Sequence, residues 1–167
     1  MSILLRGLLA GILVTMMWSC AAVPGNTKDV GTLPTATADQ ATLVVYREHA
    51  EPVAMGAALQ VNAQAVAMLH QHQWTWIRVA PGSYSIVAHW SAMSGQKDSH
   101  LEVQVKAGDI HFYEIVGVSR AADVTPTFAG ALITVLLGSG VREVESVGAV
   151  DTIQHRCHFK QANGSGE

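Results

Sequence analysis

Hydrophobic and polar side chains alternate with a period of two on both sides of Pro81-Gly82. Apolar residues take every second position in residues 75–79 and again in residues 84–90. Such alternation is typical of half-buried β-strands. Proline presets its own φ at about −65°, and glycine tolerates the positive φ that tight turns need. The pattern therefore predicts an antiparallel hairpin that turns at Pro81-Gly82.

The same analysis predicts about seven short strands between residues 41 and 118. They span residues 41–47, 57–62, 65–69, 75–79, 84–90, 101–106 and 110–117. Turn-forming residues separate them; Asn62-Ala-Gln64 suits a tight turn because asparagine tolerates a left-handed φ. Short strands at regular spacing, each with one apolar face, predict an all-β fold: an antiparallel β-sandwich whose two sheets share a core.

A C-terminal extension, residues 119–160, follows this predicted domain. Residues 119–127 are polar, whereas residues 128–138 contain a single polar side chain and are too few to cross a bilayer. Three interpretations of residues 128–138 stay open: a buried strand or hairpin that covers the sandwich edge, a loop that exposes apolar surface to lipid or a partner, and a short buried helix. We expect a strand near residues 141–146, a helix or turn within 147–155, and a disordered tail at 161–167.

The N-terminus carries an export signal. Arg6 precedes an apolar stretch at residues 8–18 that is shorter than the ~20 residues of a membrane-spanning helix but suits a secretory signal peptide. The sequence Met17-Trp-Ser-Cys-Ala21 then resembles the lipobox of bacterial lipoproteins. In that family the signal peptide, here residues 1–19, is removed and the cysteine, here Cys20, is lipidated, including with palmitate.

Lipidation of Cys20 implies a permanent membrane anchor, because several acyl chains hold a protein stably on a bilayer. Alanine at position 21, in place of the family's aspartate retention signal, implies the outer membrane and a periplasmic orientation. Ordinary signal cleavage after residues 20–22 and a retained helical anchor are the alternatives. Residues 20–40 have the Pro, Gly and Thr-Ala content of a flexible tether, and ~20 extended residues reach ~65 Å.

Four segments together resemble a family of bacterial lipoproteins of unknown function. They are Ala-Thr-Leu-Val-Val-Tyr-Arg, Val-Asn-Ala-Gln-Ala-Val-Ala-Met-Leu, Ile-Arg-Val-Ala-Pro-Gly-Ser-Tyr-Ser-Ile-Val-Ala and Val-Lys-Ala-Gly-Asp-Ile-His-Phe-Tyr-Glu-Ile, in that order within residues 41–118. The resemblance implies a transthyretin-like (prealbumin-like) or PEGA-like β-sandwich. That family has no established catalytic residues, so the resemblance implies no catalytic site.

Charge and cysteine content narrow the possible partners. The net charge is −3 and no Lys/Arg cluster occurs, which argues against a nucleic-acid-binding surface. The two cysteines are Cys20 and Cys157. Because lipidation consumes Cys20, we expect Cys157 to have no disulfide partner within the chain. It is then a buried cysteine, a reactive thiol or a thiol that pairs with another chain.

Histidines provide the only metal-ligand pattern in the sequence. His70 and His72 lie two residues apart, and His155 and His158 flank Cys157. Zinc and copper use such ligands, so His70 and His72 are weak candidates for metal ligands, and the chain would then be a periplasmic metal-binding protein. The competing interpretation is that they are solvated loop histidines.

Three tryptophans, Trp74, Trp76 and Trp90, could form an aromatic face for a sugar or a peptide. Packing at the edge of the core is the competing interpretation, since the indole combines a large apolar ring with one donor.

No arrangement of side chains in the sequence indicates an enzyme. Asp109, His111 and Glu114 do not make a hydrolytic set, and Ser83 lacks the surroundings of a nucleophile elbow. The sequence also has no phosphate loop and no dinucleotide fingerprint. We therefore expect a non-enzymatic binding or structural module of the envelope that needs no cofactor. Its expected partners are an envelope protein, peptidoglycan or another copy of itself; metal binding by the histidines is the alternative function.

Overall fold

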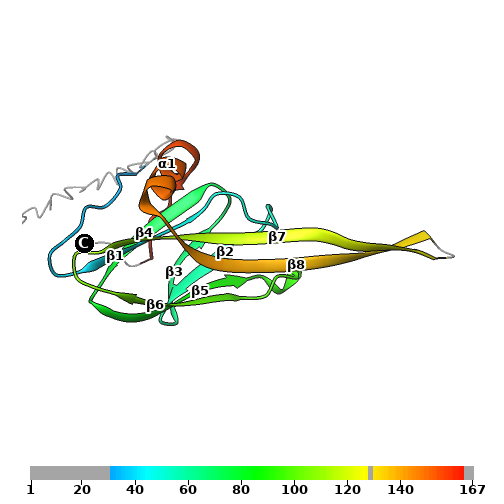
Figure 1. The fold of residues 1–167 in the computed structure, drawn as a ribbon, viewed down its shortest axis with the longest axis horizontal. Coiled ribbons are helices and arrows are strands. Elements are labelled where there is room, and N and C mark those ends of the chain that lie inside the picture. The colour runs from blue at the N-terminus through cyan, green and yellow to red at the C-terminus, as the bar shows by residue number, and fades with distance from the viewer. Residues whose placement is uncertain (1–30, 128–129, 164–167) are drawn as a thin grey trace, which may run out of the picture.

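Two β-sheets and one α-helix form the described part of the computed structural model, residues 31–127 and 130–163 (Figure 1). The first sheet has the strand order β8-β7-β1-β4-β9, and the second has the order β3-β2-β5-β6. The prediction of an all-β fold with two packed sheets is confirmed. The predicted signal peptide and Cys20 lie outside the described residues, as does most of the predicted tail.

Each strand range that the alternating pattern predicted is occupied by a strand. The strands are β1 (Ala41–Arg47), β2 (Ala57–Val61), β3 (Gln64–Leu69), β4 (Gln73–Val79), β5 (Gly82–Trp90), β6 (Ser99–Val105), β7 (Ile110–Thr127), β8 (Gly130–Val144) and β9 (His158–Phe159). A 3-10 turn, η1 (Ala92–Ser94), and the helix α1 (Ser146–Arg156) complete the fold. The helix confirms the expectation for residues 147–155, and no helix in the described range is long and apolar enough to cross a bilayer.

The predicted hairpin at Pro81-Gly82 is wrong. Strand β4 pairs with β1 and β9, whereas β5 pairs with β2 and β6, so the two strands belong to different sheets. Pro81-Gly82 is a corner between the sheets. Alternation shows that one face of each strand is buried, but two apolar faces can meet across a sandwich as well as along one sheet.

The sheets are also not wholly antiparallel. Strand β1 pairs with β7 in parallel, and β4 pairs with β9 in parallel. Strand β1 is central in the first sheet, and every one of its residues is buried. Its continuous apolar run fits this position, because a strand that is covered on both faces does not alternate.

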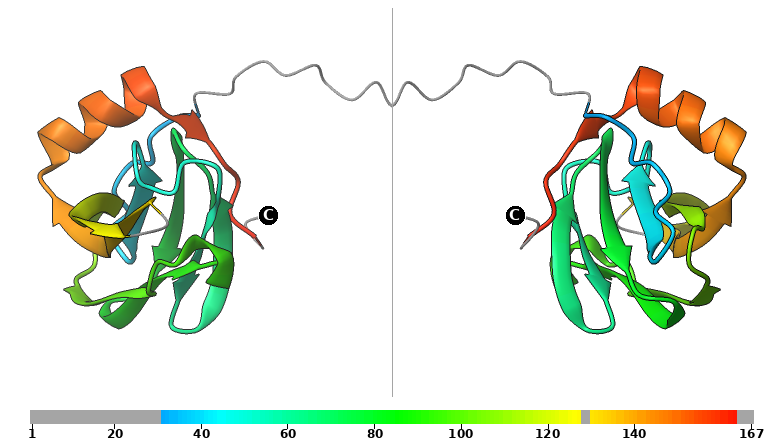
Figure 2. Two further views of the ribbon diagram at one scale, coloured as in Figure 1. Left: turned by 90° about the vertical axis from the view of Figure 1, so that its right-hand side faces the viewer. Right: turned by 90° about the vertical axis from the view of Figure 1, so that its left-hand side faces the viewer.

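Two hydrophobic clusters lie on opposite faces of the first sheet. Leu43 and Val45 belong to the core between the two sheets, together with Leu59 and Ile86 of the second sheet. The residues between and after them, Val44 and Tyr46, belong to an outer cluster with Ala149 and Ile153 of α1. Figure 2 shows the helix lying outside the sandwich. The helix therefore covers the face of the first sheet that the second sheet does not reach.

Part of the expected tether is attached to this body. Residues 31–40 form neither helix nor strand, but Leu33 packs against the outer cluster. The Gly108 N–H donates a hydrogen bond to the Gln40 carbonyl at 3.0 Å. The chain thus meets the sandwich several residues before β1 begins.

Arg47, the last residue of β1, is buried completely between the sheets. Its guanidinium donates to the carbonyl oxygens of Ala50, Pro52, Met55 and Leu69 at 2.5 to 3.0 Å. The guanidinium carbon also lies 4.9 Å from the centre of the Trp90 ring. Burial lowers the pKa of Arg47 to about 10. One side chain therefore satisfies the inward-facing carbonyls of the loop after β1 and ties that loop to β3.

The same loop also rests on β7. The Glu51 N–H donates to the Gly117 carbonyl at 2.9 Å, and a Cβ at position 117 would overlap the Glu51 carbonyl oxygen. The buried amide of Gln96 donates to the carbonyls of both Glu51 and Val118, at 3.3 and 3.2 Å. Glycine at 117 is required by this close approach of two backbones, and the contact marks the place where β7 leaves the body.

Replacement of Arg47 by leucine tests the role of the buried guanidinium. The substitution leaves the four accepting carbonyls without their donor, so we expect the free energy of unfolding to fall by about 3–5 kcal/mol. The measurement is equilibrium unfolding in urea. Arg78→Leu is the matched control. The Arg78 side chain is exposed, and its guanidinium carbon lies 5.3 Å from the centre of the Trp76 ring. Its loss should lower the free energy of unfolding by less than about 1 kcal/mol. Equal effects of the two substitutions would contradict this account.

Candidate functional site

Strands β7 and β8 form a two-stranded arm that projects from the sandwich (Figure 1). They pair antiparallel from Phe112↔Val144 to Thr127↔Gly130, with one irregularity between Ala121 and Asp123. Strand β1 pairs only with residues 110–114 of β7. Most of the length of β7 is therefore held in the sheet by β8 alone.

The arm leaves the body at a defined point. The Val118 carbonyl accepts a hydrogen bond from Gln96, and the Ser139 hydroxyl donates to the Lys97 carbonyl. Beyond these contacts, the described strand pairing of residues 119–127 and 130–137 is with each other. We define this portion as the distal arm.

The distal arm settles the alternatives for residues 128–138. Residues 130–138 belong to a strand, so the interpretations as a loop and as a short helix are wrong for them; residues 128 and 129 lie outside the described range. The prediction of a strand or hairpin is confirmed for the backbone. The hairpin, however, extends away from the sandwich instead of covering its edge. The hairpin extends outward because the last predicted strand continues past residue 117 to Thr127. It thereby gives β8 a partner along its whole length.

The two edges of the distal arm differ in chemistry. The β7 portion contains Arg120, Asp123 and Pro126, which are the residue types that prevent a strand edge from pairing further. The β8 portion has no charged residue and no proline from Gly130 to Val141. An edge strand presents unpaired N–H and C=O groups, so the β8 edge is the stronger candidate for binding another strand.

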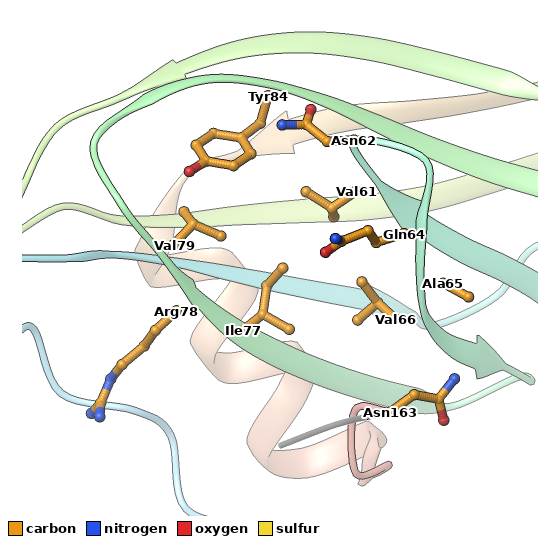
Figure 3. A pocket seen from close by; sticks show the side chains of 10 residues that line it. All are labelled: Val61, Asn62, Gln64, Ala65, Val66, Ile77, Arg78, Val79, Tyr84 and Asn163. Carbon is orange, nitrogen blue, oxygen red and sulfur yellow. The ribbon is translucent and has the colours of Figure 1, made fainter. Parts of the chain in front are cut away.

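A pocket of about 330 Å³ opens at one end of the sandwich, between the Asn62–Gln64 turn and the corner that joins β4 to β5 (Figure 3). Val61, Val66, Ile77 and Val79 give it apolar walls, and the amides of Asn62, Gln64 and Asn163 give it polar ones. Arg78 is the only ionisable lining residue apart from the Tyr84 hydroxyl, and in Figure 3 its guanidinium points away from the others. The lining suits contact with a small uncharged polar group but contains no acid–base pair.

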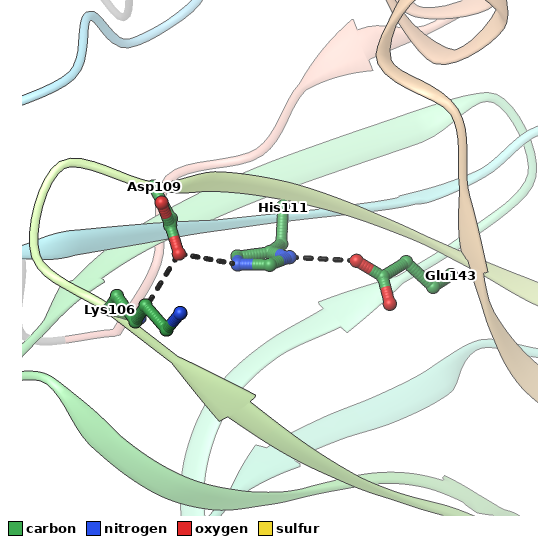
Figure 4. Close-up of polar contacts among 4 residues, drawn as sticks. All are labelled: Lys106, Asp109, His111 and Glu143. Atoms are coloured by element: carbon green, nitrogen blue, oxygen red, sulfur yellow. Dashed lines mark hydrogen bonds and ion pairs between the residues drawn. The ribbon is translucent and has the colours of Figure 1, made fainter.

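His111 lies between two carboxylates at the start of β7 (Figure 4). Its Nδ1 is 2.7 Å from a Glu143 oxygen. Its Nε2 is 3.4 Å from Asp109 Oδ2, and this second contact is an ion pair without a hydrogen bond. The Lys106 backbone N–H donates to the same Asp109 oxygen at 3.2 Å. The ring also stacks on Tyr113, with centroids 6.2 Å apart. This cluster joins the turn before β7 to β8.

The histidines named as weak metal candidates lie in the turn between β3 and β4. Both His70 and His72 are exposed, and His72 has a positive φ of 57°. The His72 backbone donates to the Glu48 carbonyl and accepts from the His158 N–H at 2.7 Å, so the fold brings together two histidine clusters that are far apart in sequence. Within residues 31–127 and 130–163, no three His, Cys, Asp or Glu side chains converge as metal ligands.

The three tryptophans do not form a common face. Trp74 is buried in the outer cluster, where it meets Phe159 edge-on at 5.0 Å. Trp90 is buried in the core between the sheets, beneath Arg47. Trp76 is partly buried at the margin of the outer cluster. The hypothesis of an aromatic binding face is therefore wrong, because the strand positions of Trp74 and Trp90 direct them into two separate cores.

Cys157 is buried at the end of α1, with 2% of its surface exposed. Burial, followed by the nearby Glu48 and Glu114 carboxylates, raises the pKa of its thiol to about 12. The neighbouring Tyr46 has its pKa raised to about 12, again mainly by burial. Cys157 therefore packs as a small apolar residue of the outer cluster, which confirms the expectation of a buried cysteine.

Sequence reasoning did not single out Arg47, Gln96 or Gly117, which hold the root of the arm. One signal for the arm was present: two segments of similar length, residues 119–127 and 130–138, flank Phe128-Ala129. Equal lengths on either side of a short connection are typical of a hairpin. No protein-family model matches the chain, and the search among curated proteins found no match either.

The state of Cys157 can be checked with a thiol-modifying reagent. At pH 8 a thiol with a pKa of about 12 is thiolate in only about one molecule in ten thousand, so we expect no modification of Cys157 in the folded protein and rapid modification in urea. Mass spectrometry of the Cys157 peptide measures the extent of modification in the folded protein and in urea. Val147→Cys, at a helix position that is 82% exposed, should react without denaturant and serves as the control. Equal reactivity of Cys157 and of the thiol introduced by Val147→Cys in the folded state would contradict the burial.

Proposed function

We propose that the chain is a lipid-anchored protein of the bacterial envelope that works as a non-enzymatic binding module. Cys20 carries the lipid, the signal peptide before it is removed, and the module faces the periplasm from the outer membrane. The lipobox-like sequence at residues 17–21 supports the anchor. The two-sheet architecture supports a sandwich of the transthyretin-like or PEGA-like kind, to which the mixed strand directions add two parallel pairs.

The distal arm is the observation on which the binding role rests. The two paired strands of the distal arm extend beyond the sandwich, which is the position of a contact element and not of a core element. Isolated two-stranded hairpins are marginally stable in water and gain stability when further strands or a packing surface join them. The β8 edge offers unpaired backbone groups without charges or proline, so we assign recognition to this edge.

The direction of the arm suits a tethered module. The first described residues enter the sandwich at the end opposite the tip of the arm (Figure 1). An anchor at Cys20 would thus hold the module by one end and leave the arm extended away from the point of attachment. Binding then needs neither a cofactor nor a catalytic residue, since the anchor supplies location and the arm supplies contact.

Substitution of Cys20 tests the anchor. Cys20→Ala, expressed in a bacterium with an outer membrane, removes the only thiol that can be lipidated at this site. We expect the variant either to appear in the soluble periplasmic fraction or to keep its signal peptide, because without acyl chains nothing holds it to the bilayer. Fractionation and mass measurement distinguish the outcomes. Cys157→Ala is the matched control and should stay membrane-bound. Unchanged processing and membrane association of Cys20→Ala would refute lipidation.

Shortening of the arm tests the binding role. Residues 120–136 are replaced by Asn-Gly, which joins the paired residues Ser119 and Leu137 by a two-residue hairpin turn. We expect the free energy of unfolding to change by less than about 1 kcal/mol, because the removed strands pair with each other alone. Chemical cross-linking of intact envelopes should give adducts with the full chain and none with the shortened one. Collapse of stability would show that the arm is core, and identical adducts would remove it from recognition.

A further inference from the structure

We infer that the β8 edge of the distal arm pairs antiparallel with the β8 edge of a second copy of this chain, with a two-fold axis at Thr134. The inference rests on the proposed role of the arm as the contact element and names its partner. Each copy would contribute two strands, and the result would be a four-stranded sheet between two sandwiches.

The need for another strand follows from the geometry of the arm. Past the contacts of Val118 and Ser139 with the body, the described strands β7 and β8 pair only with each other. Two strands alone are marginal in water, whereas a sheet of three or more with apolar residues is stable. The sequence of residues 130–137 is apolar at every position except Thr134. Such a strand at an open edge pairs with another strand unless charges or prolines prevent it.

The chemistry of the two edges selects β8 over β7. Arg120, Asp123 and Pro126 occupy the β7 side of the distal arm, and proline has no N–H to donate to a neighbouring strand. The β8 side has none of these residue types between Gly130 and Val141. An added strand therefore finds a continuous set of donors and acceptors only along β8.

The sequence of β8 is complementary to itself in the antiparallel sense. With Thr134 opposite Thr134 of the second copy, Ile133 faces Val135, Leu132 faces Leu136 and Ala131 faces Leu137. Every aliphatic residue then lies opposite an aliphatic one, and the two threonines, the only polar residues of the segment, lie opposite each other. Such Thr–Thr pairs are favourable across strands, and no like charges are opposed.

Symmetry and space favour a second copy over a different protein. A two-fold contact uses one surface twice, and this is the commonest way in which soluble chains associate. The paired segment, residues 131–137, ends before Ser139, where the arm meets the body. Antiparallel pairing places each sandwich at the tip of the other arm, so the two bodies lie at opposite ends of the joint sheet.

Disulfide cross-linking of the full-length protein in its own membranes tests both the partner and the register. In Thr134→Cys, the two introduced thiols lie opposite each other across the axis, and mild oxidation should give a covalent dimer. We expect at least about tenfold more dimer than with Val147→Cys on the exposed face of α1, because a disulfide needs Cα atoms within about 7 Å. The unsubstituted chain, with Cys157 buried, sets the background.

Offset positions provide the matched control for register. Leu132→Cys or Leu136→Cys alone places the thiols four residues apart across the axis and should give little dimer, whereas coexpression of the two variants should give a mixed dimer. Leu132→Lys combined with Leu136→Lys should reduce the native mass in detergent to that of one chain while the thermal unfolding temperature of the body stays unchanged.

Two results would overturn the inference. Absence of a Thr134→Cys dimer above the Val147→Cys level would exclude pairing between copies at this edge. A Thr134→Cys adduct with a different protein would replace the second copy by that protein while leaving the arm as the contact element. If the variant with the shortened arm keeps all adducts of the full chain, the proposed binding role fails as well, so the two failures are distinguishable.

Discussion

Burial of the Arg47 guanidinium is the constraint on which the arrangement of this protein depends. A cation between two sheets must replace its lost water by hydrogen bonds, and Arg47 does so through Nη1 and Nη2, which donate to carbonyls of the loop after β1 and of β3. The loop is therefore drawn back over the end of the sandwich. There Glu51 meets Gly117, and Gln96 joins both segments. The loop that Arg47 holds thus lies against β7 at the place where the arm begins.

The body and the distal arm are stabilised in different ways. In the body, β1 is covered by the second sheet on one face and by α1 on the other, so its apolar residues are buried whichever way they point. Beyond Val118 the described strands of the arm have only each other. A hairpin without a third strand or a covering surface gains little from its apolar sequence. The strands of the body are thus covered by other layers, whereas the described strands of the distal arm are paired with each other.

Polar groups elsewhere in the described residues hold elements together. The His111 cluster connects the turn before β7 with Glu143 of β8, and His72 links the loop after β1 to β9 through its backbone. Arg142 and Glu114 form a further ion pair between β7 and β8 at 2.5 Å. The contacts of His111 and Arg142 lie on the body portion of the β7–β8 pair. They join β7 to β8 at the base of the arm.

The sequence by itself determined the strands, because a period of two in side-chain polarity reports which residues face a core. It also determined the turn at Asn62–Gln64 and the contrast between polar residues 119–127 and apolar residues 130–138, and it left a helix or a turn open for residues 147–155, where the structure has α1. Only the tertiary structure decided which strands pair. It separated β4 from β5, placed β1 beside β7 in parallel, buried Trp74 and Trp90 in different cores, and extended β7 and β8 past the body as an arm. The reason is that local alternation records burial but not the identity of the covering element, and a partner from a distant part of the chain is chosen by tertiary packing.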